Sequence, residues 1–162
     1  MPGVSLVIDI LRHGEAAPSS PDGDGGRPLS EAGAAQVRAL ARRLVADGWA
    51  PDRAFASPLR RARETGALML AALPAPPALE LLEELQPEAE PADLVAALKA
   101  LEATRGHLLL VSHMPLVARL SAFCCGRPES FLPADLARLD CADGLARGSA
   151  IWRGFPVRPD SG

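Results

Sequence analysis

The sequence predicts an α/β fold in which a mainly parallel central sheet is flanked by helices. Short apolar segments typical of buried strands alternate with segments whose apolar residues recur at helical spacing, and this alternation favours parallel strands joined by helices. The chain has 162 residues, a length that suits one domain, and its mean hydropathy of +0.10 argues against disorder. We therefore expect a single domain over residues 1–162.

The first strand and the first helix are predicted on either side of a polar loop. The apolar run from Val4 to Ile10 is typical of a buried strand, and the chain turns after it at Gly14. Residues 16–27 are rich in Gly, Pro, Ser and Asp and are expected to form a loop. Ser30 is then predicted to cap a helix that ends at Gly48.

A short strand over residues 53–56 is expected to lead directly into the second helix. Ser57 is a candidate N-cap for this helix, and Pro58 stands at its first position, where no N–H is needed. Pro74 ends the helical pattern, and the segment from Pro74 to Pro91 is interpreted as a connection.

The second half of the chain continues the alternation. The predicted elements are a helix after Pro91, a strand over residues 107–111, a helix from about residue 115 to Gly126, and strands over residues 135–140 and 149–155.

Two histidines and two arginines follow three of the predicted strands. Arg12 and His13 follow the first strand, Arg61 lies in the helix after the second, and His113 follows the strand over residues 107–111. The carboxyl ends of parallel strands meet at one edge of a sheet, so these side chains should converge there. Arginine forks and helix N-termini bind phosphate oxygens, so the cluster suits a phosphoryl group. His107 precedes its strand and is expected to have a structural or exposed role.

Three motifs carry a resemblance to a known family. The segments 12–14 (Arg-His-Gly), 57–65 and 111–117 resemble, in order and spacing, the signatures of the histidine phosphatase superfamily, also called phosphoglycerate mutase-like. The short chain and Arg27-Pro28-Leu29-Ser30 followed by Gly33 are most similar to the SixA-type phosphohistidine phosphatases. The resemblance extends from residue 4 to about residue 124 and implies a three-layer α/β/α sandwich.

The resemblance also implies a mechanism. Neutral His13 would attack phosphorus and form a phosphohistidine intermediate that water then hydrolyses, without a metal or an organic cofactor. Positive groups would stabilise the charge on the transferred phosphoryl oxygens. The substrate-binding residues implied are Arg12, Gly14, Arg27, Arg61 and His113.

The proton donor is a separate question. In phosphomonoesterases and mutases of the superfamily a glutamate protonates the departing alkoxide, and Glu84 resembles its counterpart, with Glu83 as the adjacent alternative. SixA-type enzymes are thought not to depend on such an acid, because imidazole leaves more readily than an alcohol. A solvated loop face is the alternative interpretation of both glutamates.

Three functions follow from these motifs, in descending order. The first is dephosphorylation of a phosphohistidine in a protein, because the segment from Pro74 to Pro91 is too short to form a lid over small substrates. The second is hydrolysis of small phosphate monoesters such as sugar, nucleotide-precursor or phosphoglycerate-type esters. The third is a non-catalytic phosphate- or phosphoprotein-binding module, which would not need to retain His13.

Composition argues against several other classes. A net charge of −3 disfavours a nucleic-acid surface, and no apolar stretch approaches the roughly eighteen residues of a membrane span. The N-terminal run lacks the basic region of a signal peptide, so we expect a cytoplasmic protein. The three cysteines, Cys124, Cys125 and Cys141, have neither disulfide-framework nor zinc-site spacing, and they are expected to be reduced.

Overall fold

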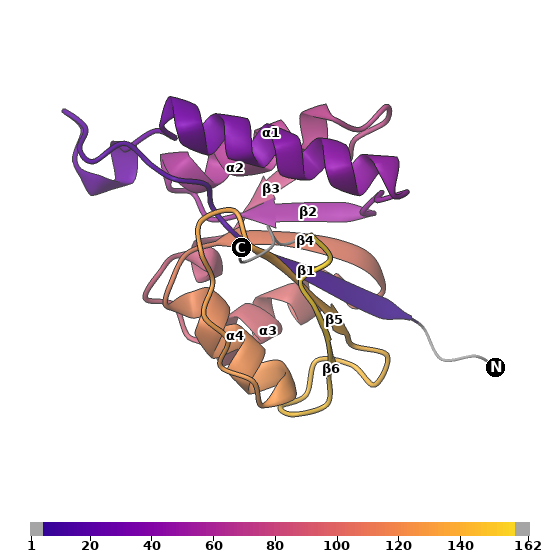
Figure 1. The fold of residues 1–162 in the computed structure, drawn as a ribbon. Helices are drawn as coiled ribbons and strands as arrows, with labels where there is room; N and C mark the ends of the chain where they lie inside the picture. Colours follow the sequence, from indigo (N-terminus) through magenta and orange to yellow (C-terminus); the bar gives the residue numbers. More distant parts are fainter. Residues whose placement is uncertain (1–4, 158–162) are drawn as a thin grey trace.

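The computed structural model describes residues 5–157 and confirms the predicted α/β fold. A six-stranded sheet with the order β3-β2-β4-β1-β5-β6 lies between two layers of helices (Figure 1). The strands are β1 (Leu6–Arg12), β2 (Arg53–Ala56), β3 (Leu79–Leu81), β4 (Gly106–Ser112), β5 (Leu136–Asp140) and β6 (Ile151–Gly154). The helices are α1 (Glu31–Ala46), α2 (Arg60–Ala71), α3 (Pro91–Ala100) and α4 (Leu116–Cys125), with 3-10 turns η1 (Asp24–Gly26) and η2 (Glu83–Leu85).

The sheet is mainly parallel, as predicted. Strands β3, β2, β4 and β1 pair in parallel, whereas β5 runs antiparallel to β1 and β6 runs antiparallel to β5. Helices α1 and α2 cover one face of the sheet, and α3 and α4 cover the other (Figure 1). No helix within residues 5–157 is both long enough and apolar enough to cross a membrane.

Each face of the sheet carries its own hydrophobic core. Side chains alternate between the faces along a strand, so in β4 Leu108 and Leu110 pack with α3 and α4, whereas Leu109 and Val111 pack with α1 and α2. All four are fully buried. A central parallel strand covered on both faces is expected to be a continuous apolar run. This is why the sequence shows β4 so clearly.

The predicted ends of the first and fourth helices are confirmed. The Ser30 hydroxyl accepts a hydrogen bond from the N–H of Gly33 at 3.0 Å and caps α1. Gly48 follows α1 with a φ of 91°, and Gly126 ends α4 with a φ of 73°. Both are left-handed conformations that favour glycine at helix ends.

The predicted start of the second helix is wrong. Helix α2 begins at Arg60, its N-cap is Leu59, and Ser57 does not cap it. The N–H of Ser57 donates to the carbonyl of Val111 at 3.0 Å, which continues the pairing of β2 with β4. Its hydroxyl accepts from the N–H of Leu59 at 3.2 Å and bonds to His113 at 2.8 Å. Ser57 therefore extends the carboxyl end of β2 and does not belong to the helix. Pro58 also precedes the helix.

Two further differences concern strand limits. The segment from Pro74 to Pro91, interpreted as a connection, contains β3 and η2. Strand β3 lies at the edge of the sheet and pairs only with β2. Because it has three residues and follows several prolines, it is too short to show the alternation of apolar and polar residues that predicts a strand. The first strand extends to Arg12, and Val4, placed in it by the sequence, lies outside the described residues.

A buried carboxylate fastens the middle of the sheet. Asp9 in β1 is 0% exposed. It accepts hydrogen bonds from Trp49 Nε1 at 2.8 Å, from His107 Nε2 at 2.6 Å and from Arg138 Nε at 2.7 Å. These donors come from the segment after α1, from β4 and from β5. The network gives His107 the structural contact expected of it.

We predict that Asp9→Asn lowers the free energy of unfolding at neutral pH by about 2 kcal/mol, because hydrogen bonds to a charged group are lost. Burial raises the pKa of Asp9, but the bonds and charges of His107 and Arg138 outweigh it and lower the pKa. Ionised Asp9 therefore stabilises the folded state at pH values above the unfolded-state pKa of about 3.9. This stabilisation is lost as the pH falls through the lower folded-state value.

Urea unfolding from neutral pH to about pH 3 measures both effects. The difference between the wild type and Asp9→Asn should shrink below about pH 4. Asp143→Asn, which removes one carboxylate from an exposed loop, is the matched control and should leave the free energy of unfolding within about 0.5 kcal/mol of the wild type. Equal effects of the two substitutions would contradict the assigned role of Asp9.

Candidate active site

The ends of three parallel strands bring the two histidines and the arginines together. Arg12 pairs in register with Ser112, and the N–H of His13 donates to the carbonyl of Ser112 at 3.0 Å. His113 is the next residue along β4. Its ring and the ring of His13 have centroids 4.9 Å apart. The expected convergence at the carboxyl edge of the sheet is thus observed.

The two ring nitrogens of His13 differ: one donates a hydrogen bond, and the other carries a lone pair. Its Nδ1 donates to the carbonyl of Gly14 at 2.6 Å, so the proton of a neutral ring is on Nδ1. Nε2 then carries a lone pair, and it accepts from Nε of Arg61 at 3.3 Å. The ring is buried, and its orientation is fixed from both ends. This is the arrangement that a nucleophilic imidazole requires.

Arg61 lies in the first turn of α2 and is almost completely buried. Besides its contact with His13, its Nη1 donates to the main-chain carbonyl of Asp24 at 3.0 Å, and its Nη2 lies 3.4 Å from the Asp24 carboxylate. Thr65, one turn further along α2, accepts from the N–H of Gly14 at 3.1 Å and donates to the carbonyl of Arg61 at 2.7 Å. Thr65 therefore connects the Arg61 turn to the turn that follows His13.

His113 is held by Ser57, a contact that sequence reasoning missed. Nε2 of His113 lies 2.8 Å from the hydroxyl of Ser57. Among the described residues, its Nδ1 and the Nε of Arg12 are the buried side-chain nitrogens without a hydrogen-bond partner. Buried polar groups are normally satisfied. Arg12 Nε is a donor, and His113 Nδ1 is a donor in the tautomer in which the Ser57 hydroxyl donates to Nε2. In that tautomer the two nitrogens fit a bound oxyanion.

Arg12 is anchored by the loop that precedes β5. Its Nη1 donates to the carbonyl of Phe131 at 2.6 Å, and its main-chain N–H donates to the carbonyl of Asp135 at 3.0 Å. Burial lowers the pKa of Arg12, and the negative charge of Asp135 opposes this shift. The guanidinium remains charged in either case.

Burial keeps both histidines neutral. It lowers the pKa of His13 to about 4, with the hydrogen bond to Gly14 opposing the shift and nearby arginine charges adding to it. Burial likewise lowers the pKa of His113 to about 3, helped by the positive charges around it. At neutral pH His13 is therefore an unprotonated base beside fixed cations.

Arg27 lies beside this cluster on the loop before α1. Its Nε donates to the carboxylate of Asp24 at 2.9 Å and its Nη1 to the carbonyl of Ala17 at 3.1 Å. Its charge contributes to the lowered pKa of His13. Glu64 of α2 accepts from the N–H of Leu29 at 2.9 Å and so fastens this loop to the helix.

Gly14 is required by helix packing. A Cβ at this position would lie 2.8 Å from a side-chain carbon of Val37 and 3.0 Å from the carbonyl oxygen of Gly33. Helix α1 therefore packs directly against the turn after His13. A larger residue would displace either the helix or the turn.

Glu84 is not hydrogen-bonded to the histidines of the cluster. It lies in η2 and is half-buried, and Glu83 beside it is exposed. The carbonyl of Leu85 accepts a hydrogen bond from the hydroxyl of Ser112 at 2.5 Å, so η2 is attached to the end of β4. Within residues 5–157, no hydrogen bond or ion pair joins Glu84 to His13 or His113. The structure thus places Glu84 in a segment next to the site without a direct contact.

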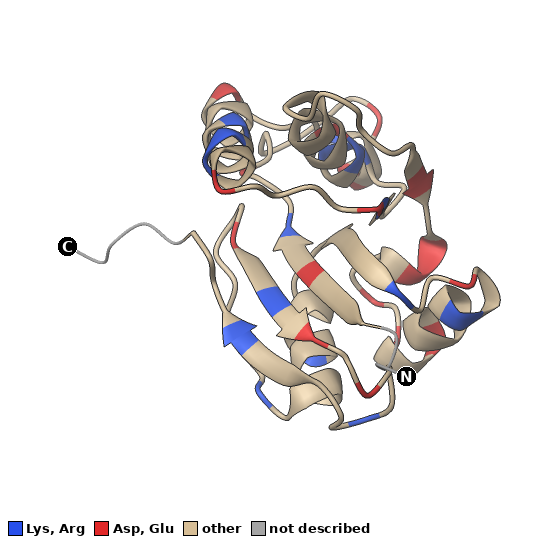
Figure 2. Ribbon diagram, turned by 90° about the vertical axis from the view of Figure 1, so that its right-hand side faces the viewer, with Lys and Arg blue, Asp and Glu red and all other residues tan. Residues whose placement is uncertain are grey.

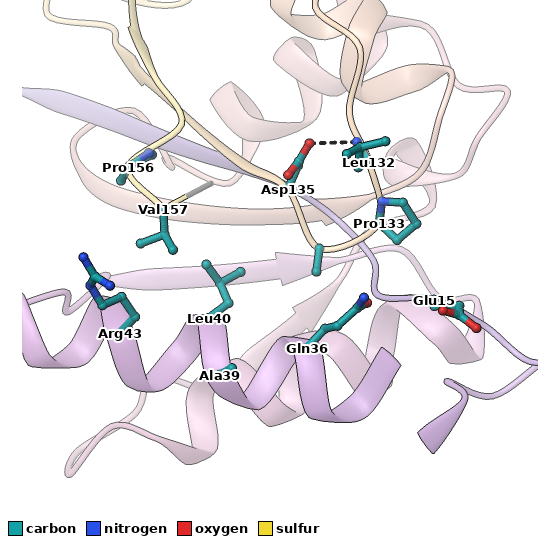
Figure 3. A pocket seen from close by; sticks show the side chains of 11 residues that line it. Glu15, Gln36, Ala39, Leu40, Arg43, Leu132, Pro133, Asp135, Pro156 and Val157 are labelled. Carbon is teal, nitrogen blue, oxygen red and sulfur yellow. Dashed lines mark hydrogen bonds between the residues drawn. The ribbon is translucent and has the colours of Figure 1, made fainter. Parts of the chain in front are cut away.

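A separate cavity of about 790 Å³ is lined by Glu15, two residues after His13 (Figure 3). Helix α1 forms one wall, and the loop before β5 and the segment after β6 form the other. Glu15 lines it, but neither histidine of the cluster does. This cavity and the chemical cluster are therefore neighbours and not one site.

The cluster is cationic, although charges on the molecule as a whole are mixed. Figure 2 shows segments of both signs interspersed over the helices and strands. Within the part of the chain that the structure describes, no three His, Cys, Asp or Glu residues lie close enough together to hold a metal ion.

Comparisons with known proteins agree with this geometry. A sequence model of the histidine phosphatase superfamily (branch 1) matches residues 8–88. Phosphohistidine phosphatase SixA of Escherichia coli (strain K12) is 31% identical over 154 residues, which cover 93% of this chain and 94% of that protein.

Two solved structures have folds similar to that of this chain. That of the protein histidine phosphatase SixA complexed with tungstate matches with a TM-score of 0.81 and 29% identity over 93% of this chain and 97% of that chain. Phosphoserine phosphatase of Entamoeba histolytica in complex with 3-phosphoglyceric acid matches with a TM-score of 0.68, covering 95% of this chain and 98% of that chain. At 13% identity the second likeness shows the fold alone.

We predict that the rings of His13 and His113 do not titrate between about pH 5 and 8, because burial and positive neighbours keep them neutral. NMR titration of the histidine ring signals in the ligand-free protein measures this. Arg27→Gln removes one cation that lowers the pKa of His13, so it should raise that pKa. Arg42→Gln removes an exposed charge from α1 and should leave it unchanged. A His13 ring that titrates at its ordinary value of 6.5 would contradict the described electrostatics.

Proposed function

Since the chain belongs to the histidine phosphatase superfamily and is a phosphatase, we propose that it removes the phosphoryl group from a phosphohistidine of a protein substrate through a phosphoenzyme at His13. The observation that carries this proposal is the state of His13. Its Nδ1 is bonded to Gly14, and its neutral Nε2 lies beside the guanidinium of Arg61. We also treat residues 1–162 as one catalytic domain, because one sheet extends from Leu6 to Gly154.

The reaction has two displacements. In the first, Nε2 of His13 attacks phosphorus in line with the leaving nitrogen, so that a new P–N bond forms as the substrate's P–N bond breaks. In the second, water attacks the phosphoryl group on His13, which releases inorganic phosphate and restores the neutral ring. The Gly14 carbonyl holds the Nδ1 proton throughout and stabilises the positive charge that develops on the ring.

The surrounding donors stabilise the transferred group. Arg12, Arg61 and His113 come to the His13 ring from three separate elements, and each is held by contacts within the protein. Preorganised donors around a developing charge are a large catalytic contribution. In this proposal, the unsatisfied Nε of Arg12 and Nδ1 of His113 bind phosphoryl oxygens.

Two observations support a protein substrate. The relative at 31% identity over 93% of the chain is a phosphohistidine phosphatase. The segment between α2 and α3 holds only the three-residue strand β3 and the three-residue turn η2. Both are attached to neighbouring strands, at β2 and at Ser112. The segment is therefore short and held against the sheet, which leaves little of it to form a lid. A site without a lid suits a side chain presented on a protein surface.

A small phosphate ester is the second candidate substrate. It is favoured by the attachment of η2, which carries Glu84, to the end of β4, where His113 follows. A non-catalytic binding module is the third candidate, and the unprotonated Nε2 of His13 argues against it, because a binding module would not need to retain the nucleophile.

We predict that His13→Ala abolishes turnover of a histidine-containing peptide phosphorylated with phosphoramidate, because no phosphoenzyme can form. Wild-type protein quenched within one turnover of labelled substrate should carry an acid-labile, base-stable label on His13. The thermal midpoint of His13→Ala should stay near that of the wild type, which shows that the fold persists. Normal turnover in this variant would overturn the assignment of the nucleophile.

We predict that Glu84→Gln lowers kcat on the phosphohistidine peptide by less than about tenfold, because imidazole leaves already protonated. An enzyme that must protonate an alkoxide would lose about 10²–10⁴-fold. Turnover of the phosphopeptide and of an alkyl phosphate by Glu84→Gln, with Glu83→Gln as the control, measures the difference. A thousandfold loss on the peptide, together with a wild-type preference for the alkyl ester, would replace the protein substrate with a small ester.

A further inference from the structure

The carboxylate of Asp24 lies against two arginines of the candidate site. Its Oδ1 accepts from Nε of Arg27 at 2.9 Å, and its Oδ2 lies 3.4 Å from Nη2 of Arg61. The Asp24 carbonyl also accepts from Nη1 of Arg61 at 3.0 Å. Because Nε of Arg61 contacts His13, one guanidinium connects the nucleophile to this carboxylate.

Asp24 is exposed, whereas the carboxylates of Asp135 and Glu64 near the cluster are held by main-chain N–H groups. Asp135 is buried, and its Oδ2 accepts from the N–H of Leu132 at 2.8 Å. Glu64 is occupied by the N–H of Leu29 and by Arg60. The side chain of Asp24 is 70% exposed. Of these three carboxylates, Asp24 is therefore the one that the leaving portion of a bound substrate can reach from solvent.

The imidazole ring that leaves a phosphohistidine is positively charged in the reactive form of the substrate. Its P–N bond breaks readily only when the other ring nitrogen is protonated, because the ring then takes the electron pair of the bond and departs as neutral imidazole. An unprotonated ring would have to depart as the imidazolate anion. The reactive substrate is thus cationic at its leaving portion, whereas that portion is neutral in simple esters and anionic in esters that carry a carboxylate.

We propose that Asp24 is a specificity-determining residue that favours phosphorylated rings with positive charge and disfavours phosphate esters with additional negative charge. This inference rests on the proposed function and names the feature of the substrate that the site selects. Attraction to one charge and repulsion of the other both contribute to such discrimination.

Asp24 acts as a charge and not as an acid. The positive charge of Arg61 lowers its pKa, and the hydrogen bond from Arg27 lowers it further. It is therefore a carboxylate at neutral pH and has no proton to give. The proton that the departing ring needs is already on the ring when the substrate binds.

Three probes that differ in the charge of the leaving portion test this inference. They are phosphoimidazole, p-nitrophenyl phosphate and 2-phosphoglycolate, which are protonated, uncharged and anionic there. With Asp24→Asn we expect kcat/KM to fall about fivefold for phosphoimidazole and to rise about fivefold for phosphoglycolate, the size typical of one partly exposed charge pair. For p-nitrophenyl phosphate it should change less than about twofold.

Two further variants control for structural effects. Asp22→Asn removes the same charge from an exposed position in the same loop and should leave all three values unchanged. Asp24→Glu retains the charge and should retain the wild-type order of preference. If Asp24→Asn lowers all three values alike, Asp24 merely supports Arg61 and the inference is overturned. If the wild type prefers phosphoimidazole and Asp24→Asn leaves the ratio of kcat/KM for phosphoimidazole to kcat/KM for phosphoglycolate unchanged, this inference alone is overturned. If the wild type is inactive on phosphoimidazole, the proposed function is overturned with it.

Discussion

The parallel pairing of β1 with β4 is the constraint on which the rest of the site depends. Its register sets Arg12 beside Ser112, and the hydrogen bond from the His13 N–H to the Ser112 carbonyl continues the pairing one residue past β1. His13 and His113 consequently leave the sheet at the same edge. A shift of one residue would turn one of the two side chains to the opposite face. The buried Asp9 network, which joins β1 to β4 and β5, opposes such a shift.

The cluster that this pairing creates has a high density of positive charge in a buried place. Burial lowers the pKa of both histidines well below the ordinary value, and the fixed charges of the arginines add to the shift. The result suits the proposed chemistry, because the nucleophile must be neutral while its surroundings attract phosphate. The Asp24 carboxylate neutralises part of the excess charge at the exposed side of the cluster.

Much of the fold could be predicted because its signals are local. The apolar runs of β1 and β4, the serine at the start of α1 and the glycine after α4 each depend on a few neighbouring residues. Ser57 shows the limit of such signals. Serine before proline is a good helix start, but the bonds of Ser57 to Val111 and His113 keep it at the sheet edge. Those partners are more than fifty residues away, and no local pattern contains them.

The sequence by itself determined the fold class and the kind of site: the strand-helix alternation predicted the fold, and the two histidines after strands with the arginine of the second helix predicted a site for a phosphoryl group. The resemblance of the three motifs to the histidine phosphatase superfamily then implied a phosphatase. Only the tertiary structure decided which hydrogen bonds and ion pairs these groups make with one another. It placed the Gly14 carbonyl on one ring nitrogen of His13, a turn of α2 against the other, and Asp24 beside Arg27 and Arg61. The physical reason is that local propensity acts over a few residues. Hydrogen-bond geometry, burial and electrostatic fields arise only where distant segments pack together.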